Sequence, residues 1–210
     1  MDKIIKESKW FIGIALYMFI TAISGFILDD GLVMFLTINM FLAGVGYGIT
    51  LVLVYVKDKA YPKWLSIALL VVWILFFPNM IYITTDFIHL QNYDFFGIYS
   101  QTYVYQFSDW YVLFIIFSGA MISAKFGMHA VQLLSDAFQV KRYQYIYKLI
   151  LFGLSSVGIY IGRFIRLNSW QAFRVDIIFS EIFENFSFFI GFVAIFVCIH
   201  FIYDLLFSKR

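Results

Sequence analysis

The chain contains six apolar blocks of about twenty residues each, and this feature restricts its fold more than any other. A helix needs about 20 apolar residues to cross a hydrocarbon core of about 30 Å. The blocks are continuous, whereas the strands of a membrane barrel alternate between apolar and polar residues. The sequence therefore predicts an all-α integral membrane bundle. The predicted spans are Trp10 to Leu28, Gly31 to Val56, Trp64 to Ile83, Trp110 to Leu134, Tyr145 to Ile161 and Phe188 to Phe207.

The charge content supports the same conclusion. Only 13% of the residues are charged and 63% are hydrophobic, whereas about a quarter of a soluble domain is charged. We therefore expect a single transmembrane domain, residues 1–210, with the lipid bilayer as its main partner. The net charge of +2 and the absence of a Lys/Arg run give no indication of a nucleic-acid partner. A single cysteine, Cys198, excludes an internal disulfide and a cysteine-based metal site.

The basic residues predict the orientation, because loops rich in Lys and Arg stay in the cytoplasm. One set of connections and termini carries Lys3, Lys6, Lys9, Lys57, Lys59, Lys63, Lys141, Arg142, Lys148, Lys209 and Arg210. The opposite side carries Asp29, Asp30, Asp86, Asp94, Asp109, Asp176, Glu181 and Glu184, with Arg163, Arg166 and Arg174. The sequence thus predicts a multipass protein of the cell membrane with both termini in the cytoplasm.

An amphipathic helix is predicted on the outer surface before the last span. Its apolar face would hold Val175, Ile178, Phe179, Ile182, Phe183 and Phe186, and its polar face Arg174, Ser180, Glu181 and Glu184. One helix from Ala172 to Phe207 would be far longer than the bilayer, so we expect a break near Ser187.

The other long outer loop, Gln91 to Ser108, is rich in aromatic residues. Such residues suit the headgroup level of a membrane. The loop is interpreted either as an interfacial belt or as a lid over a site. Within the spans, Gly44 and Gly48, and again Gly158 and Gly162, lie four residues apart, which predicts close helix packing.

Polar residues near the end of the third span form the first part of a candidate site. Pro78 removes a backbone donor and predicts a kink. If the helix continues past Thr84, the side chains of Asn79, Tyr82, Asp86 and His89 share one face. Asp86 and His89 are the candidate catalytic residues, as an acid–base pair.

The end of the fifth span supplies the second part. Arg163 and Arg166 lie three residues apart, and Asn168, Ser169 and Trp170 follow. The predicted topology brings this stretch to the same outer face as Asp86. An ion pair of Asp86 with Arg163 or Arg166 would relieve the desolvation of both charges. Together with Asn79 and Tyr82, these residues are the candidate binding site for an anion or lipid head group, since the arginine fork matches phosphate and carboxylate.

These two stretches resemble those of the bacterial multipass membrane family catalogued as domain of unknown function 1361. Its pattern combines P-N-x-P-Y-x-x-T-D-x-x-H-L with G-R-F-x-R-x-N-S-W-D, and the resemblance covers essentially the whole chain. The chain departs from it at Ile81, where the family usually has proline, and at Gln171, where it usually has aspartate. If that aspartate is catalytic in the family, this chain is an altered member. The resemblance implies a multipass membrane protein and brings no activity with it.

The remaining titratable residues within the spans lie toward the cytoplasmic side. His129 and His200 are at similar depth and are interpreted as hydrogen-bonded bundle residues or, alternatively, as axial ligands of a haem between two helices. They are about 20 Å or more from His89, which argues against a shared metal site. Lys125 is expected to pair with Asp204 or to extend toward the cytoplasm.

Several functions are compatible with the sequence. The polar patch could be a clamp between two spans, an anion site, or the site of an enzyme that acts on a lipid-linked envelope substrate through Asp86, His89, Arg163 and Arg166. No nucleophile motif, P-loop or zinc signature supports an enzyme. Small size and short cytoplasmic loops favour a non-catalytic component or protein partner of an envelope or transport assembly that binds an anionic lipid. The sequence leaves the ligand and any cofactor open.

Overall fold

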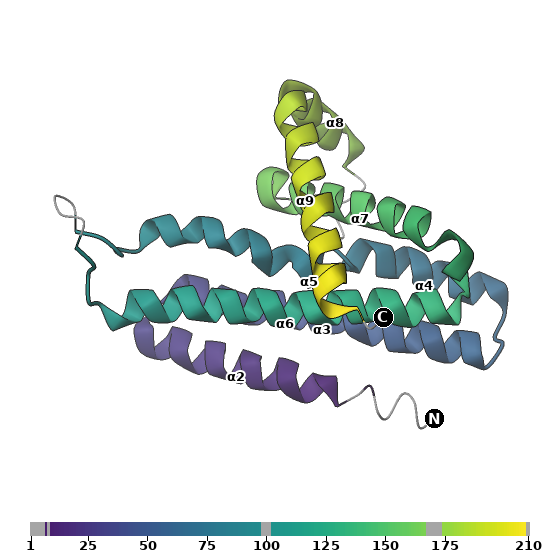
Figure 1. The fold of residues 1–210 in the computed structure, drawn as a ribbon, viewed down its shortest axis with the longest axis horizontal. Helices are drawn as coiled ribbons and strands as arrows, with labels where there is room; N and C mark the ends of the chain where they lie inside the picture. Colours follow the sequence, from purple (N-terminus) through teal and green to yellow (C-terminus); the bar gives the residue numbers. More distant parts are fainter. Residues whose placement is uncertain (1–6, 8, 98–101, 167–173, 209–210) are drawn as a thin grey trace.

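The structure is a computed structural model that describes residues 7, 9–97, 102–166 and 174–208 (Figure 1). Its helical elements are α2 (Trp10–Leu28), α3 (Gly31–Asp58), α4 (Lys63–Phe76), α5 (Asn79–Tyr82), η1 (Ile83–Asn92), α6 (Phe107–Ala137), η2 (Val140–Tyr143), α7 (Gln144–Tyr160), η3 (Ile161–Ile165), α8 (Val175–Glu184) and α9 (Phe186–Phe207). The elements η1 and η2 are 3₁₀-helices, and η3 is a short π-helix. Apart from an isolated bridge between Phe96 and Tyr103, the described residues form no β-structure.

Six helical segments are long and apolar enough to cross a membrane, which confirms the predicted all-α membrane bundle. They are Trp10–Leu28, Gly31–Asp58, Lys63–Asn92, Phe107–Ala137, Gln144–Ile165 and Phe186–Phe207. The third segment differs most from its predicted end at Ile83. Its helix continues to Asn92 because the backbone tightens into the 3₁₀-helix η1 and keeps local hydrogen bonds.

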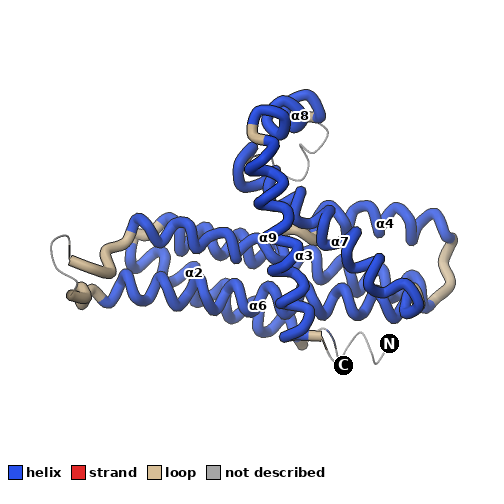
Figure 2. The backbone as a smooth tube through the Cα atoms, turned by 45° about the horizontal axis from the view of Figure 1, so that its top comes forward, coloured by secondary structure: helices blue, strands red, loops and turns tan. Residues whose placement is uncertain are grey.

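Four of the spans run side by side along the long axis of the molecule (Figure 1). These are α2, α3, the interrupted span α4–α5–η1, and α6. We call the end with residues 93–97 and 102–106 the loop end, and the opposite end, with Lys57, Lys59 and Lys63, the lysine end. The last span, α9, crosses the others steeply, and its first turns project away from the bundle together with α8, as Figures 1 and 2 agree. The orientation of α9 was not anticipated from its hydropathy.

The predicted amphipathic helix is present as α8, and α9 follows it after a single residue, Asn185. The break is therefore two residues earlier than expected. The apolar residues Val175, Phe179 and Phe183 are all exposed. They lie four residues apart and so form one stripe along α8. Near its start, Arg174 hydrogen-bonds to Asp176 and lowers the pKa of that exposed carboxyl group.

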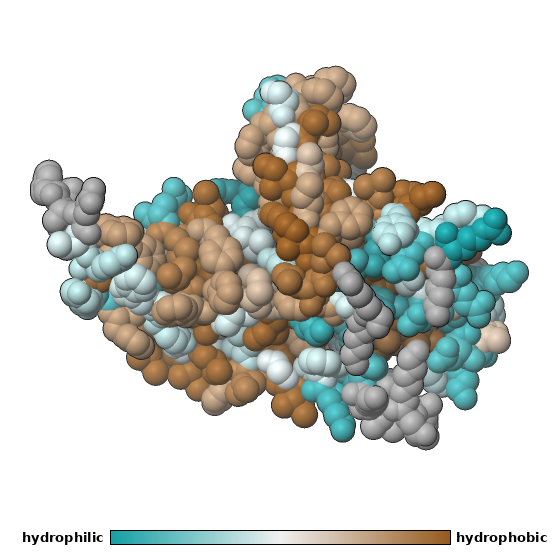
Figure 3. Space-filling view, in the orientation of Figure 1, coloured by the Kyte–Doolittle hydropathy of each residue, from teal (hydrophilic) through white to brown (hydrophobic). Residues whose placement is uncertain are grey.

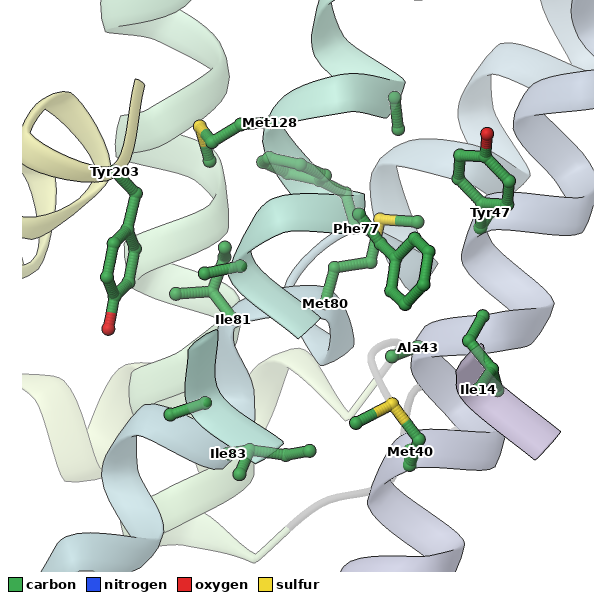
Figure 4. Close-up of a cluster of buried hydrophobic side chains, with 14 of the residues drawn as sticks. Ile14, Met40, Ala43, Tyr47, Phe77, Met80, Ile81, Ile83, Met128 and Tyr203 are labelled. Carbon is green, nitrogen blue, oxygen red and sulfur yellow. The ribbon is translucent and has the colours of Figure 1, made fainter. Parts of the chain in front are cut away.

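The core lies where the third span is interrupted. As predicted, Pro78 breaks the helix, and α4 ends two residues before it. Figure 4 shows Phe77, Met80 and Ile81 lying among side chains of α2, α3, α6 and α9. All three are fully buried. Ile81 is thus part of the core.

The two glycine pairs are packing contacts, as predicted. A Cβ atom on Gly158 would lie 2.6 Å from the Pro78 side chain, and one on Gly162 would lie 3.1 Å from the Tyr82 ring. A Cβ atom on Gly44 would lie 3.3 Å from the Ile14 side chain, and one on Gly48 would lie 3.7 Å from the Phe11 ring, both in the first span. The glycines of the fifth span therefore let α7 approach the interrupted third span, which brings the two polar stretches together.

The aromatic loop packs on the start of α6. Trp110 donates to the Val104 carbonyl at 2.9 Å, and the Asp109 carboxylate accepts the Asp94 amide at 2.9 Å. Tyr93 donates to Asp30 Oδ2 at 2.7 Å, and burial together with this hydrogen bond raises the pKa of the Tyr93 phenol. These contacts hold the loop at the loop end.

The hydropathy of the surface differs between the middle of the molecule and the lysine end. Figure 3 shows hydrophobic residues over the middle of the molecule and a concentration of hydrophilic residues at the lysine end. Many large apolar side chains are exposed along the spans, among them Phe19, Ile38, Phe114 and Phe117. Lipid is the environment that suits such a surface, so the chain is a multipass membrane protein.

Candidate functional site

Asp86 is the centre of the candidate site. Its side chain is completely buried, and it lies on η1. Oδ2 accepts a hydrogen bond from Asn39 Nδ2 on α3 at 2.8 Å, and Oδ1 forms an ion pair with Arg163 Nη2. The structure therefore confirms the expected pairing and selects Arg163 rather than Arg166. Both carboxylate oxygens have a partner, so the buried charge is compensated.

Arg163 connects this carboxylate to two further side chains. Nε donates to Thr85 Oγ1 at 2.9 Å, Nη2 also contacts that oxygen, and Nη1 lies 3.0 Å from His89 Nε2. Arginine is always a donor, so His89 Nε2 must be the acceptor and a neutral His89 carries its proton on Nδ1. We call Asn39, Thr85, Asp86, His89 and Arg163 the Asp86 cluster.

Local backbone features place these side chains. The 3₁₀-helix has three residues per turn, so Asp86 and His89 lie directly above one another and reach the same guanidinium group. Arg163 lies in the π-helix η3, where an extra residue in the turn changes the direction of a side chain. Thr85 Oγ1 donates to the Tyr82 carbonyl at 2.7 Å, which leaves its lone pairs to accept from Arg163.

Tyr82 and Asn79, the other two residues predicted to share a face with Asp86 and His89, have different surroundings. Tyr82 belongs to the site: its ring lies 4.7 Å from the Arg163 guanidinium carbon, and its hydroxyl donates to the Gly162 carbonyl at 3.3 Å. Asn79 is not brought to the cluster. Its amide instead donates to the Phe76 carbonyl at 3.2 Å, beside the Pro78 break. The four residues therefore do not form one continuous polar face.

The second arginine of the candidate site is exposed. Arg166 follows η3 with a left-handed backbone (φ 58°) and forms no ion pair with any residue that the structure describes. The predicted binding residues Asn168, Ser169 and Trp170 lie outside the described residues, as does Gln171. Among the described candidates, the charge of Arg163 is cancelled by Asp86, whereas Arg166 keeps its charge.

The depth of the cluster follows from helix geometry. Asn39 is eight residues from the start of α3, which corresponds to about 12 Å at a rise of 1.5 Å per residue. Asp86 is six residues from the end of η1, which also corresponds to about 12 Å at 2.0 Å per residue. The site thus lies well inside the loop end, deeper than the surface patch that the sequence suggested.

Asn39 is the cluster residue that sequence reasoning missed. It is 5% exposed and bonds to a carboxylate 47 positions later in the chain. The available signal was an isolated amide within an apolar span, which is costly unless it has a partner. Thr85 was noticed only as part of the family pattern, and its role as an acceptor for Arg163 depends on the tertiary fold.

The two deeper histidines have protein partners. His200 is buried, with Nδ1 2.6 Å from the Phe196 carbonyl and Nε2 2.9 Å from Ser155 Oγ. His129 Nε2 lies 2.6 Å from Glu7 Oε2. Axial haem ligation would have to replace these contacts, so the geometry favours the alternative interpretation of hydrogen-bonded bundle residues. Among the described residues, no group of three or more His, Cys, Asp and Glu side chains is arranged to hold a metal ion.

Of the two alternatives predicted for Lys125, the pairing with Asp204 is wrong. Lys125 Nζ donates instead to the Phe207 carbonyl at 3.0 Å, at the end of α9. Asp204 pairs with Lys148 of α7 at 2.6 Å. The steep crossing of α9 explains the difference, because it brings the side of its last turns to α7 and its final carbonyl to α6. A lysine at a helix C-terminus also compensates the partial negative charge there.

A second carboxylate site was not anticipated. Glu7 lies just before α2, and its Oε2 accepts from Tyr47 and Trp10, both at 3.2 Å, and contacts His129. Burial raises the pKa of Glu7, but the hydrogen bonds and charge of His129 and the bonds of Tyr47 and Trp10 outweigh it, so the net pKa is lowered. We call Glu7, Trp10, Tyr47 and His129 the Glu7 cluster.

The chemistry open to the Asp86 cluster is limited by these contacts. A general base must present a free lone pair to a proton on the substrate. His89 Nε2 already uses its one lone pair to accept from Arg163. Asp86 is completely buried, and its oxygens accept from Asn39 and Arg163, so it is closed to a substrate. The arrangement is therefore better suited to holding three spans together and to presenting positive charge beside them than to abstracting a proton.

Comparison with known proteins adds one finding. A family model described as a protein of unknown function (DUF1361) matches residues 38–203. The match includes every residue of the Asp86 cluster and leaves the first span outside, so it is shorter than the whole-chain resemblance. No curated protein and no solved structure matches the chain.

Proposed function

The chain belongs to the DUF1361 family, whose function is unknown, and we propose from its geometry that it is a non-catalytic membrane protein that binds an anionic lipid or head group. On this proposal it serves as a component or partner of a cell-envelope or transport assembly. The Asp86 cluster is the rigid support of the site, and Arg166 is the ligand-binding residue.

One observation carries the proposal: an exposed arginine lies three residues after a half-buried arginine whose charge is compensated. Asp86 cancels the charge of Arg163, while Arg166, three residues later, has no ion-pair partner among the described residues. An arginine without a counter-ion near the hydrocarbon boundary is strongly stabilised by a phosphate or carboxylate. Lipid head groups provide such anions at this depth of a bilayer.

The orientation forms part of the same proposal. The lysine end carries Lys57, Lys59 and Lys63, and the loop end carries Asp29, Asp30 and Asp94. Because basic loops remain in the cytoplasm, we place the lysine end and the termini there and the loop end outside, in the cell membrane. The anionic head group would then belong to the outer leaflet.

Lipid binding to the purified protein in nanodiscs tests the proposal. The nanodiscs contain phosphatidylcholine with increasing phosphatidylglycerol, and native mass spectrometry counts the retained phosphatidylglycerol. We expect Arg166→Ala to weaken retention by about tenfold, the loss of one charge-assisted hydrogen bond. Arg174→Ala is the matched control, because Arg174 is also exposed but is paired with Asp176. Equal retention by the wild-type protein and Arg166→Ala would refute the proposed binding site.

A further inference from the structure

We infer that a hydrated path leads from the surface at the loop end to the end of the fifth span, so that water-soluble phosphate or carboxylate groups reach Arg166 and His89 at membrane depth. The inference rests on the proposed function for the identity of the ligand class. The existence of the path itself rests on the backbone of the third and fifth spans.

The fifth span ends well inside the bundle. α6 and the fifth span are joined by a short connection at the lysine end, but the former has 31 residues and the latter only 22. At 1.5 Å per residue, the fifth span stops about 14 Å before the loop end of α6. A bundle of about 46 Å centred on a hydrocarbon core of about 30 Å has its boundary about 8 Å from each end. The end of the fifth span is therefore several ångströms inside that boundary.

Two polar residues lie at the depth where the fifth span ends, and both have exposed surface. Arg166 is exposed, and His89 is half-buried with Nε2 held by Arg163. A charged side chain in contact with hydrocarbon is expensive, and its cost falls when water or head groups reach it. The first turns of α9 pack on the end of the fifth span, where the Phe188 and Phe192 rings lie 5.0 and 5.1 Å from the Phe164 ring, and Arg166 stays exposed beyond this contact. Water is thus the environment that best fits an exposed Arg166.

The third span is interrupted beside the fifth. Pro78 separates α4 from α5, and the backbone then tightens into η1. Gly158 faces Pro78 and Gly162 faces Tyr82, so the two irregular segments are in contact. Irregular backbone within a membrane is tolerated where it is buried in protein or lines a water-filled space. Around Pro78 this backbone is buried in protein, because Phe77, Met80 and Ile81 are fully buried. Toward the loop end it reaches the half-buried His89 and the exposed Arg166, where water can line it.

Cysteine labelling of the reconstituted full chain tests the path. In a Cys198→Ser background, which removes the native thiol, Arg166→Cys is compared with Phe117→Cys. Phe117 is ten residues from the start of α6, about 15 Å deep, and it is 52% exposed on the side of a span. Both variants are treated with a membrane-impermeant maleimide from each side of the vesicle. Maleimides react with the thiolate, which forms in water and not in hydrocarbon.

We expect Arg166→Cys to react from the loop-end side at least about tenfold faster than Phe117→Cys, because only the former thiol can ionise in contact with water. Equal rates for the two variants, or labelling of Arg166→Cys only from the lysine-end side, would overturn the hydrated path. Circular dichroism and gel filtration of each variant verify that the rates come from folded protein.

A second variant, His89→Cys, tests which anion binds, independently of whether the hydrated path exists. His89→Cys keeps Arg166, and its labelling is followed with inorganic phosphate in solution or with phosphatidylglycerol in the vesicle. Slower labelling with phosphate supports a soluble anion as the ligand, and slower labelling with phosphatidylglycerol alone supports a lipid head group. If neither slows it while Arg166→Cys still reacts, the proposed anion site is wrong and the hydrated path is supported on its own.

Discussion

The Asp86 and Glu7 clusters each compensate the charge of a carboxylate that lies between helices, but at different depths of the bundle. In each, a carboxylate accepts hydrogen bonds from side chains of other helices, and α3 contributes a donor to both: Asn39 to Asp86 and Tyr47 to Glu7. The Asp86 side chain is 0% exposed and is paired with an arginine, whereas Glu7 is 14% exposed and is paired with a histidine.

The difference in partner fits the difference in depth. A carboxylate several ångströms inside the hydrocarbon boundary needs a counter-ion that cannot lose its proton, and arginine meets this requirement. Nearer the membrane surface, water can replace a lost interaction, so a titratable histidine is tolerated. We therefore expect the Asp86 cluster to be a permanent part of the fold and the Glu7 cluster to respond to pH.

Removal of the buried carboxylate should have the largest effect. Asp86→Leu leaves the half-buried Arg163 charge without its counter-ion, which we expect to lower the free energy of unfolding by about 3 kcal/mol. Glu7→Leu is the matched variant and should cost clearly less. Denaturant unfolding in detergent micelles, followed by circular dichroism, measures both.

The double variant Asp86→Leu/Arg163→Met provides the control for this prediction. It removes both charges, so we expect it to be more stable than Asp86→Leu alone. If the losses of stability in Asp86→Leu and in Arg163→Met, each measured alone, simply add in the double variant, the ion pair does not explain the stability of the cluster. The contrast with the Glu7 cluster would then be one of packing.

The next largest effect is expected at Asn39. Asn39→Leu removes a hydrogen bond to a buried carboxylate, which typically contributes about 1.5–3 kcal/mol. Asn79→Leu is the matched control. Asn79 donates to the Phe76 carbonyl, and a neutral hydrogen bond contributes about 0.5–1.5 kcal/mol. Equal losses in the same unfolding assay would show that Asn39 does not orient Asp86.

The sequence was sufficient for the spans but not for their arrangement. Span length and composition are local properties, so five of the six predicted spans are close to the observed ones, and the third is extended by η1. The tilt of a span depends on which side chains pack against its neighbours. For α9 these include the buried His200 and Tyr203, and no pattern in the sequence identifies their partners on other helices.

The same distinction applies to the site. The pairing of Asp86 with an arginine followed from two facts visible in sequence: a buried charge needs a partner, and both stretches emerge at one end. Asn39 and the Lys148–Asp204 pair depend on the rotation of α3 and α9 about their axes. Glu7 was overlooked because it precedes the first apolar block, in a segment read only for its positive charge.

The smallest and most specific effect concerns pH at the Glu7 cluster. The pKa of Glu7 in the folded protein is below its ordinary value of 4.5. A carboxyl group with a lowered pKa stabilises the fold above its unfolded pKa, and this stabilisation is lost as the pH falls through the folded pKa. We therefore expect the wild-type protein to melt at a higher temperature than Glu7→Gln at pH 7, and the difference to shrink progressively as the pH falls below 4.5. Trp10 fluorescence reports the same change locally, since its indole donates to Glu7. A difference in melting temperature that persists unchanged to pH 3 would mean that the Glu7 charge does not hold this cluster together, and the two clusters would then differ in depth but not in their response to pH.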